Sequence, residues 1–255
     1  MNLIDTHCHL YSEEFASDIE VVIHKAMAEH VGKFFLPAID SKTHEAMFLL
    51  ENNYPGKCIA MMGLHPCSIK EDYLKELKVV EEWLDKRAFP AIGEIGLDFY
   101  WDQTFKIQQY EAFRIQMEWA LQYNRPIVIH TRNAMAETIA LVKEYALKGL
   151  KGIFHCFSGS YEDALSIIDL GFYLGIGGVL TYKNSGLDNV VRKIDLHHFV
   201  VETDAPYLSP VPFRGKRNES SYIKYIAEKI AAIKNISVSE VAEVTTANAE
   251  KIFGM

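Results

Sequence analysis

The segment Pro126-Ile127-Val128-Ile129-His130 decides the fold, because it is the clearest of a series of short apolar runs rich in β-branched residues. Such runs favour buried strands. Longer stretches with apolar residues at helical spacing separate several of them, most clearly over 73–86 and 108–122. The runs begin near eight positions, which are Leu3, Lys33, Cys58, Ala91, Pro126, Gly152, Phe172 and Phe199.

Alternating strands and helices predict a parallel sheet. Eight strands within 255 residues match an α/β protein of the TIM (β/α)8 barrel type, with residues 1–255 as one domain. A doubly wound sheet is the competing architecture. Its Gly-x-Gly-x-x-Gly turn is missing after the first run, and Gly175-Ile176-Gly177-Gly178 follows the seventh run instead.

The composition is that of an ordinary globular protein, with 49% hydrophobic and 24% charged residues. Its apolar runs are far shorter than the roughly 20 residues of a membrane helix. The N-terminus has no basic region followed by an apolar one, which predicts no secretory signal and a cytoplasmic protein. Four scattered cysteines fit a reducing compartment. Nothing indicates a membrane or a stable protein partner.

Ionisable side chains recur where the strand runs end, and the C-terminal ends of barrel strands meet at one rim. Six of them come from five strands: His7, His9, Glu94, His130, His155 and Asp204. Each of these residues could have its own hydrogen-bond partner and no shared role. Six ionisable residues at equivalent positions on one rim are hard to explain in that way, because burying unpaired polar groups is costly.

Four imidazoles and two carboxylates suit one or two divalent ions such as Zn²⁺, Mn²⁺, Fe²⁺ or Co²⁺, and Mg²⁺ less naturally. Because six groups are too many for one open catalytic site, we favour two cations. Glu94, from the middle of the set, is the natural bridge between them.

For the other polar residues, the sequence predicts structural roles. Ser158 and Ser160 lack a nucleophile elbow. Ser160 with Asp163, and Ser237 with Glu240, have the spacing of a capping box at a helix start. The remaining histidines are interpreted as surface or packing residues: His24, His30, His44, His197 and His198.

Six sequence blocks in order resemble the TatD family of metal-dependent deoxyribonucleases, in the amidohydrolase-like superfamily. They are the blocks at 5–10, 63–66, 93–100, 126–132, 155–159 and 202–208, reading DTHCHL, GLHP, GEIGLDFY, PIVIHTR, HCFSG and ETDAPYL. The resemblance runs nearly end to end and implies a TIM barrel with two divalent cations, for which Mg²⁺, Mn²⁺ and Zn²⁺ are the candidates.

By the same resemblance, one cation is expected at His7, His9, Glu94 and Asp204, and the other at Glu94, His130 and His155. Phosphotriesterase-like relatives bridge their metals with a carbamylated lysine, whereas here the fourth run supplies a carboxylate directly. The implied substrate is DNA, as single strands or 3′ ends, with phosphodiester bonds hydrolysed from an end.

In that reaction Asp204 could accept the proton of the attacking water at a centre bridged by Glu94. His65 could hydrogen-bond the phosphate or protonate the leaving group, or simply pack before Pro66.

The net charge of −8 gives no general attraction for a polyanion, so a local positive field must come from loop residues. The candidates are Arg132, Arg214 and Lys216, together with Lys183 and Arg217, unless they lie in solvated loops. Four aromatic residues on the same rim could stack bases or merely pack: Tyr100, Trp101, Tyr182 and Tyr207.

Two other functions fit the sequence. A hydrolase of small amides, lactones or phosphotriesters would use the same metals in a closed, mostly apolar pocket, and an aminoacyl-tRNA ester is a related substrate. A non-catalytic metal-dependent binding protein is the other alternative, although a scaffold would not need an open coordination position.

Overall fold

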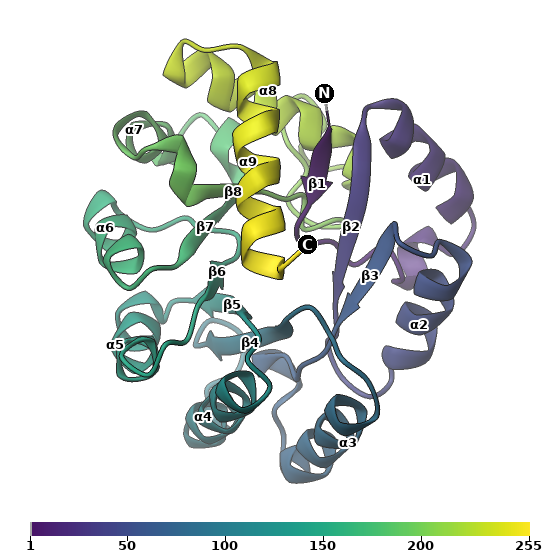
Figure 1. The fold of residues 1–255 in the computed structure, drawn as a ribbon, viewed down its shortest axis with the longest axis vertical. Coiled ribbons are helices and arrows are strands. Elements are labelled where there is room, and N and C mark those ends of the chain that lie inside the picture. Colours follow the sequence, from purple (N-terminus) through teal and green to yellow (C-terminus); the bar gives the residue numbers. More distant parts are fainter. Residues whose placement is uncertain (1) are drawn as a thin grey trace.

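The computed structural model describes residues 2–255 and is an α/β barrel in which all strand pairings are parallel (Figure 1). The strand order is β1-β2-β3 and β4-β5-β6-β7-β8. The strands are β1 (Leu3–Asp5), β2 (Val31–Pro37), β3 (Cys58–Met61), β4 (Ile92–Asp98), β5 (Ile127–Arg132), β6 (Gly152–Phe154), β7 (Tyr173–Ile176) and β8 (Phe199–Val201). The predicted TIM barrel is confirmed.

Two sets of backbone contacts join the sheet segments. The Gly93 N–H donates to the Met62 carbonyl over 3.0 Å, beside a parallel bridge between Met62 and Ile92, which links β3 to β4. The Thr6 N–H donates to the Val201 carbonyl over 3.2 Å and links the end of β1 to β8. The barrel therefore closes, and its strand ends are held on one rim.

Helices surround the strands on the outside of the barrel (Figure 1). They are α1 (Ile19–Ala28), α2 (His44–Asn53), α3 (Tyr73–Lys86), α4 (Lys106–Gln122), α5 (Met135–Ala146), α6 (Tyr161–Asp169), α7 (Leu187–Lys193), α8 (Ile223–Lys234) and α9 (Val238–Phe253). The helix predicted over 73–86 is confirmed, and the one predicted over 108–122 is observed as Lys106–Gln122, two residues longer at its start.

The two predicted helix starts are also found. Ser160 and Asp163 bond reciprocally at the start of α6, as a capping box does. Ser237 accepts from the Glu240 N–H at the start of α9.

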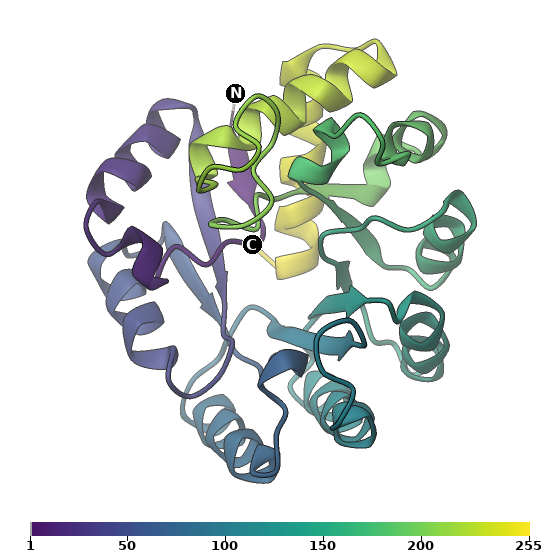
Figure 2. The same ribbon diagram turned by 180° about the vertical axis from the view of Figure 1, so that it is seen from behind.

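Helix α9 crosses one end of the barrel (Figure 1). Its last turn enters the barrel interior, where Phe253 stacks on Phe35 with 3.8 Å between ring centroids. On the other side, the segment between β8 and α8 runs over the opposite end (Figure 2). The barrel thus has one plugged end and one end where the strands' C-termini open into loops.

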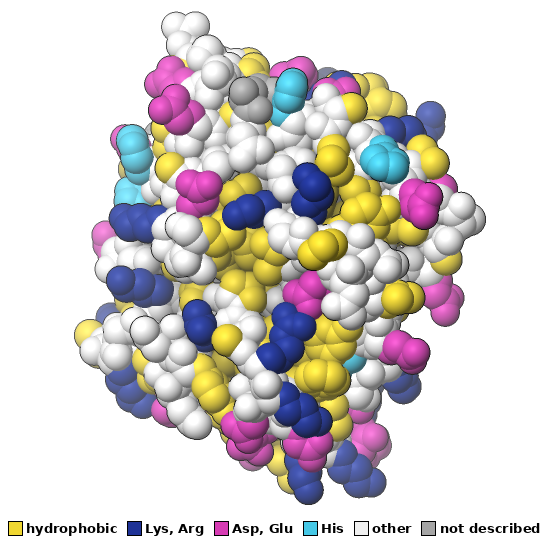
Figure 3. Space-filling view, turned by 45° about the vertical axis from the view of Figure 1, so that its right-hand side comes forward, with side chains coloured by type: hydrophobic (Ala, Val, Ile, Leu, Met, Phe, Trp, Pro, Cys, Tyr) yellow, Lys and Arg dark blue, Asp and Glu magenta, His cyan; other side chains and the backbone are white. Residues whose placement is uncertain are grey.

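The outer face on the side of α1 to α3 carries both charge signs, interspersed with hydrophobic side chains (Figure 3). None of the helices described over residues 2–255 has the length and apolarity to cross a membrane. All four cysteines are free thiols.

Truncating the plug should destabilise the barrel. Because Phe253 is only 4% exposed and stacks on Phe35, Phe253→Ala is expected to lower the free energy of unfolding by about 3–5 kcal/mol. Urea denaturation followed by circular dichroism measures this. Leu147→Ala, at a side chain 84% exposed, is the control and should cost less than about 0.5 kcal/mol. Equal effects of the two variants would contradict the plug.

Candidate metal centre

The structure brings all six predicted rim residues together at the open end of the barrel. Glu94 lies in β4 and His130 in β5, while the other four lie within four residues of the ends of β1, β6 and β8. Strand β1 ends at Asp5, earlier than the sequence suggested, so His7 and His9 lie beyond it. Their Nε2 atoms nevertheless face each other at 3.3 Å.

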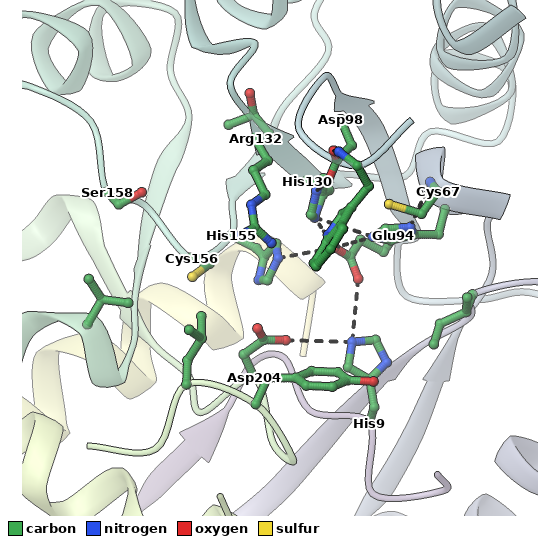
Figure 4. A pocket seen from close by; sticks show the side chains of 17 residues that line it. His9, Cys67, Glu94, Asp98, His130, Arg132, His155, Cys156, Ser158 and Asp204 are labelled. Atoms are coloured by element: carbon green, nitrogen blue, oxygen red, sulfur yellow. Dashed lines mark hydrogen bonds and ion pairs between the residues drawn. The ribbon is translucent and has the colours of Figure 1, made fainter. Parts of the chain in front are cut away.

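The Glu94 carboxylate lies among His9, His130 and His155 (Figure 4), and His7 completes two pairs of histidines around it. Its Oε2 is 3.1 Å from Nε2 of His7 and 3.5 Å from Nε2 of His9. Its Oε1 is 2.9 Å from Nδ1 of His130 and 3.1 Å from Nε2 of His155. Each carboxylate oxygen therefore serves a different pair, which is the arrangement that a bridging ligand requires.

Asp204 closes the side of the centre next to His7 and His9. Its Oδ1 is 3.8 Å from the His7 Nε2 and 3.6 Å from the His9 Nε2. Its backbone is left-handed, with φ of 56°, a conformation that aspartate tolerates better than most residues. The Asp204 N–H donates to the His7 carbonyl over 2.9 Å, which fixes the turn. Burial raises the pKa of Asp204 to about 6.

Two buried carboxylates hold the outer nitrogens of the second histidine pair. Asp98 Oδ2 is 2.9 Å from Nε2 of His130, and Glu202 Oε1 is 3.2 Å from Nδ1 of His155. A carboxylate can only accept, so the imidazoles donate from these nitrogens. When these rings are neutral, their inner nitrogens therefore carry the lone pairs that face Glu94, as in carboxylate–histidine–metal arrangements.

The first histidine pair is supported differently. The Tyr11 hydroxyl donates to the Pro37 carbonyl and lies 3.0 Å from Nδ1 of His9, so its oxygen accepts the His9 proton. This leaves the His9 Nε2 lone pair facing the centre. The Nδ1 of His7 is buried and has no hydrogen-bond partner within residues 2–255.

This donor set fits divalent cations. Burial opposes ionisation of Glu94, but the surrounding His65, His155 and His7 hold its pKa well below the ordinary value. Burial alone would lower the pKa of His155, yet Glu94 and Glu202 raise it well above the ordinary value. Several imidazole nitrogens thus converge on one carboxylate. Their lone pairs would repel its negative charge unless protons or cations lie between them. A bound cation would displace those protons.

His65 also reaches the centre, but in a different protonation pattern. Its Nδ1 accepts from the Cys67 N–H over 3.0 Å, so the neutral ring carries its proton on Nε2. That Nε2 is 3.3 Å from Glu94 Oε1 and 3.3 Å from His130 Nδ1. Burial lowers the pKa of His65, which favours this neutral form. His65 is therefore a hydrogen-bond donor at the centre.

A cavity of about 790 Å³ opens above the centre, and Arg132 and Trp101 help to line it. Arg214 and Lys216 are exposed on the segment between β8 and α8, and Lys183 is exposed after β7. Arg217, also expected to contribute to the positive field, has an acidic partner within the chain. Its guanidinium forms a paired contact with the carboxylate of Asp18, at 2.7 and 2.9 Å, so its charge is already neutralised.

Sequence reasoning missed Asp98, Glu202 and Tyr11 as supporting residues. Asp98 and Glu202 are each at most 1% exposed, and both are acids adjoining apolar strand runs. An acidic residue beside an apolar run could have indicated a buried carboxylate with a polar partner, since a buried charge needs a partner. Nothing in the sequence paired Tyr11 with His9.

The fold and this centre define a metal-dependent hydrolase. Residues 4–254 match the family model described as TatD related DNase. YabD of Bacillus subtilis, called a metal-dependent hydrolase, is 40% identical over 98% of both chains. The mouse protein TATDN3, named provisionally as a deoxyribonuclease, is 30% identical over 99% of this chain and 88% of its own.

The crystal structure of YjjV, a TatD homologue from Escherichia coli, superposes with a TM-score of 0.93 at 28% identity, covering 99% of this chain and 98% of that one. The chain therefore belongs to the TatD family of metal-dependent hydrolases.

Cation binding should stabilise the fold in a pH-dependent way. At 100 times the dissociation constant, Mn²⁺ or Zn²⁺ should raise Tm by about 5–10 °C at pH 8. The rise should be smaller at pH 6. Carboxylates raise the pKa of His155 and also that of His130, so there the cation must displace protons that these rings hold more firmly as pH falls. Differential scanning fluorimetry measures both shifts.

Glu94→Gln should abolish this stabilisation, because it removes the charge between the histidine pairs. Glu118→Gln, at an exposed side chain on α4, is the matched control and should respond like the wild type. A wild-type Tm that no cation changes at either pH would refute the metal centre.

Proposed function

We propose that the chain is a divalent-metal-dependent deoxyribonuclease that releases nucleotides from the 3′ end of single-stranded DNA. The observation that carries this proposal is the Glu94 carboxylate, whose two oxygens face different pairs of histidines. It lies at the base of a cavity that Arg132 and Trp101 also line. The match to the DNase family model supports DNA as the substrate.

In this proposal the centre would hold two cations. His7, His9, Glu94 and Asp204 would hold one, and Glu94, His130 and His155 would hold the other. Bound cations would polarise the phosphoryl group and lower the pKa of a water molecule. Asp98 and Glu202 keep His130 and His155 in the tautomers that offer lone pairs inward.

The chain's own groups then move the protons. Asp204 Oδ1 accepts a proton from the attacking water, and its pKa of about 6 leaves it ionised at neutral pH. The water oxygen bonds to phosphorus as the bond from phosphorus to the 3′ oxygen breaks. His65 hydrogen-bonds the phosphate or the leaving 3′ oxygen through its Nε2–H. The leaving oxygen takes up a proton from solvent, and Asp204 releases the one that it accepted to solvent. The products are a 5′-mononucleotide and a shortened strand.

Residues 1–255 form one catalytic unit in this proposal, and Arg132, Arg214 and Lys216 attract the strand. The four free cysteines support a reducing compartment such as the cytoplasm. Hydrolysis of a small ester or amide, or of an aminoacyl-tRNA, is the alternative reaction, and metal binding without catalysis is the alternative of another class.

The nuclease assay uses a 5′-labelled single-stranded oligonucleotide with Mg²⁺, Mn²⁺ or Zn²⁺. We expect stepwise shortening, which phosphorothioate linkages at the 3′ end block. Asp204→Asn should lower kcat roughly 10²- to 10⁴-fold, because it removes the proton acceptor. Asp169→Asn, at an exposed carboxylate on α6, is the control and should keep wild-type kcat.

Full activity of Asp204→Asn would contradict the proposed proton transfer from water to Asp204. Lack of cleavage with every cation, together with hydrolysis of a lactone or an aminoacyl-tRNA, would favour the alternative substrates.

The basic loop residues should make binding depend on salt. For single strands, each phosphate contact contributes about −0.7 to the slope of log K against log salt concentration. Arg214→Ala, at an exposed guanidinium, should therefore reduce the slope by about 0.7. Fluorescence anisotropy with a labelled oligonucleotide measures this in the Asp204→Asn background, which suppresses cleavage.

Arg217→Ala provides the matched control, because the Arg217 guanidinium is already paired with Asp18. Its slope should equal that of the parent. If both arginine variants gave the same slope as the parent, the segment between β8 and α8 would not contact phosphates.

A further inference from the structure

The turn that follows β4 is fixed by buried groups. Asp98 Oδ1 accepts the N–H groups of Tyr100 and Trp101, at 2.9 and 3.1 Å. The buried Gln109 amide accepts from the Asp98 N–H over 2.8 Å and donates to the Asp98 carbonyl over 3.0 Å. The backbone at 98–101 is therefore held rigidly at the rim.

The two aromatic side chains on this rigid turn are nevertheless exposed to solvent. Trp101 is 68% exposed and Tyr100 52% exposed, and their rings meet edge to face with centroids 4.9 Å apart. The Arg132 guanidinium lies 3.9 Å from the Tyr100 ring centroid and 5.1 Å from that of Trp101. A cation and two aromatic rings thus form one ordered surface, the aromatic clamp (Tyr100, Trp101 and Arg132).

The aromatic clamp adjoins the metal centre. Trp101 and Arg132 line the same cavity as Glu94 and His130. Arg132 follows His130 by two residues in β5, and the second oxygen of Asp98 holds the His130 ring. A single carboxylate therefore fixes both a candidate metal ligand and the turn that carries the clamp, so the distance between the two sites is set by buried hydrogen bonds.

An exposed indole beside a guanidinium recognises a flat ring attached to an anionic group. Aromatic faces and arginine stack on nucleobases with little dependence on base identity. A base that is stacked and paired in a duplex does not offer its face, whereas a base at a single-stranded end does.

We propose that the aromatic clamp binds the base of a nucleotide adjoining the scissile phosphate, and so selects single-stranded ends that carry bases. This inference rests on the proposed nuclease function. Trp101 supplies the stacking face, and Arg132, which covers Tyr100, supplies the charge next to the phosphate.

The test compares three oligonucleotides that differ only at the 3′ end. One is intact, one is abasic at the last nucleotide, and one is abasic at the nucleotide before it. Wild-type kcat/KM should be roughly 5- to 100-fold higher for the intact strand than for at least one abasic strand. Trp101→Ala should raise KM for the intact strand and shrink that ratio to within about twofold, while Trp101→Phe should retain most of it.

Ile107→Ala removes an apolar side chain that is 70% exposed at the start of α4, and serves as the control. It should keep the wild-type ratio. Binding gives a second readout that needs no catalysis. In EDTA, an intact oligonucleotide should quench tryptophan fluorescence of the wild type but not of Trp101→Phe, which retains Trp83 and Trp119.

The possible failures are distinguishable. Cleavage with equal kcat/KM for intact and abasic strands, or equal quenching in wild type and Trp101→Phe, overturns the clamp and leaves the nuclease function standing. If no strand is cleaved with any cation, the nuclease function fails and the clamp fails with it.

Discussion

The Glu94 carboxylate is the constraint on which the rest of the site depends. It is 2% exposed, and a buried charge is tolerated only when compensating groups surround it. Here the compensation is divided, with His7 and His9 at one oxygen and His130 and His155 at the other. The division places one pair of histidines at each oxygen, so a change at Glu94 affects both pairs at once.

Around this centre, other side chains orient three of the four histidines. Asp98 and Glu202 orient one pair, and Tyr11 orients His9. Asp98 also holds the turn that displays Trp101 at the rim. The candidate metal centre at the base of the cavity and the exposed Trp101 at the rim are thus coupled through short buried hydrogen bonds, which leave little freedom for either to shift alone.

The two ends of the barrel differ in character, one being apolar and closely packed and the other polar and open. Helix α9 plugs one end with Phe253, where the interior is apolar and closely packed. The open end gathers polar groups that would be costly in such a core. The overall charge of −8 does not favour a polyanionic substrate, so the proposed attraction at the open end depends on individual residues such as Arg132 and Arg214. Arg217 shows that position on this rim is not sufficient, since Asp18 neutralises it.

The sequence by itself determined the barrel and the six converging rim residues, because strand periodicity is local and parallel strands must end on one rim. It could not determine which nitrogen of each histidine faces inward, since that depends on partners far along the chain, such as Glu202 for His155. It also could not separate Arg214 from Arg217, or show that Asp98 joins His130 to Trp101. Only the tertiary structure decided these points, because hydrogen bonds and ion pairs depend on distances that folding alone establishes.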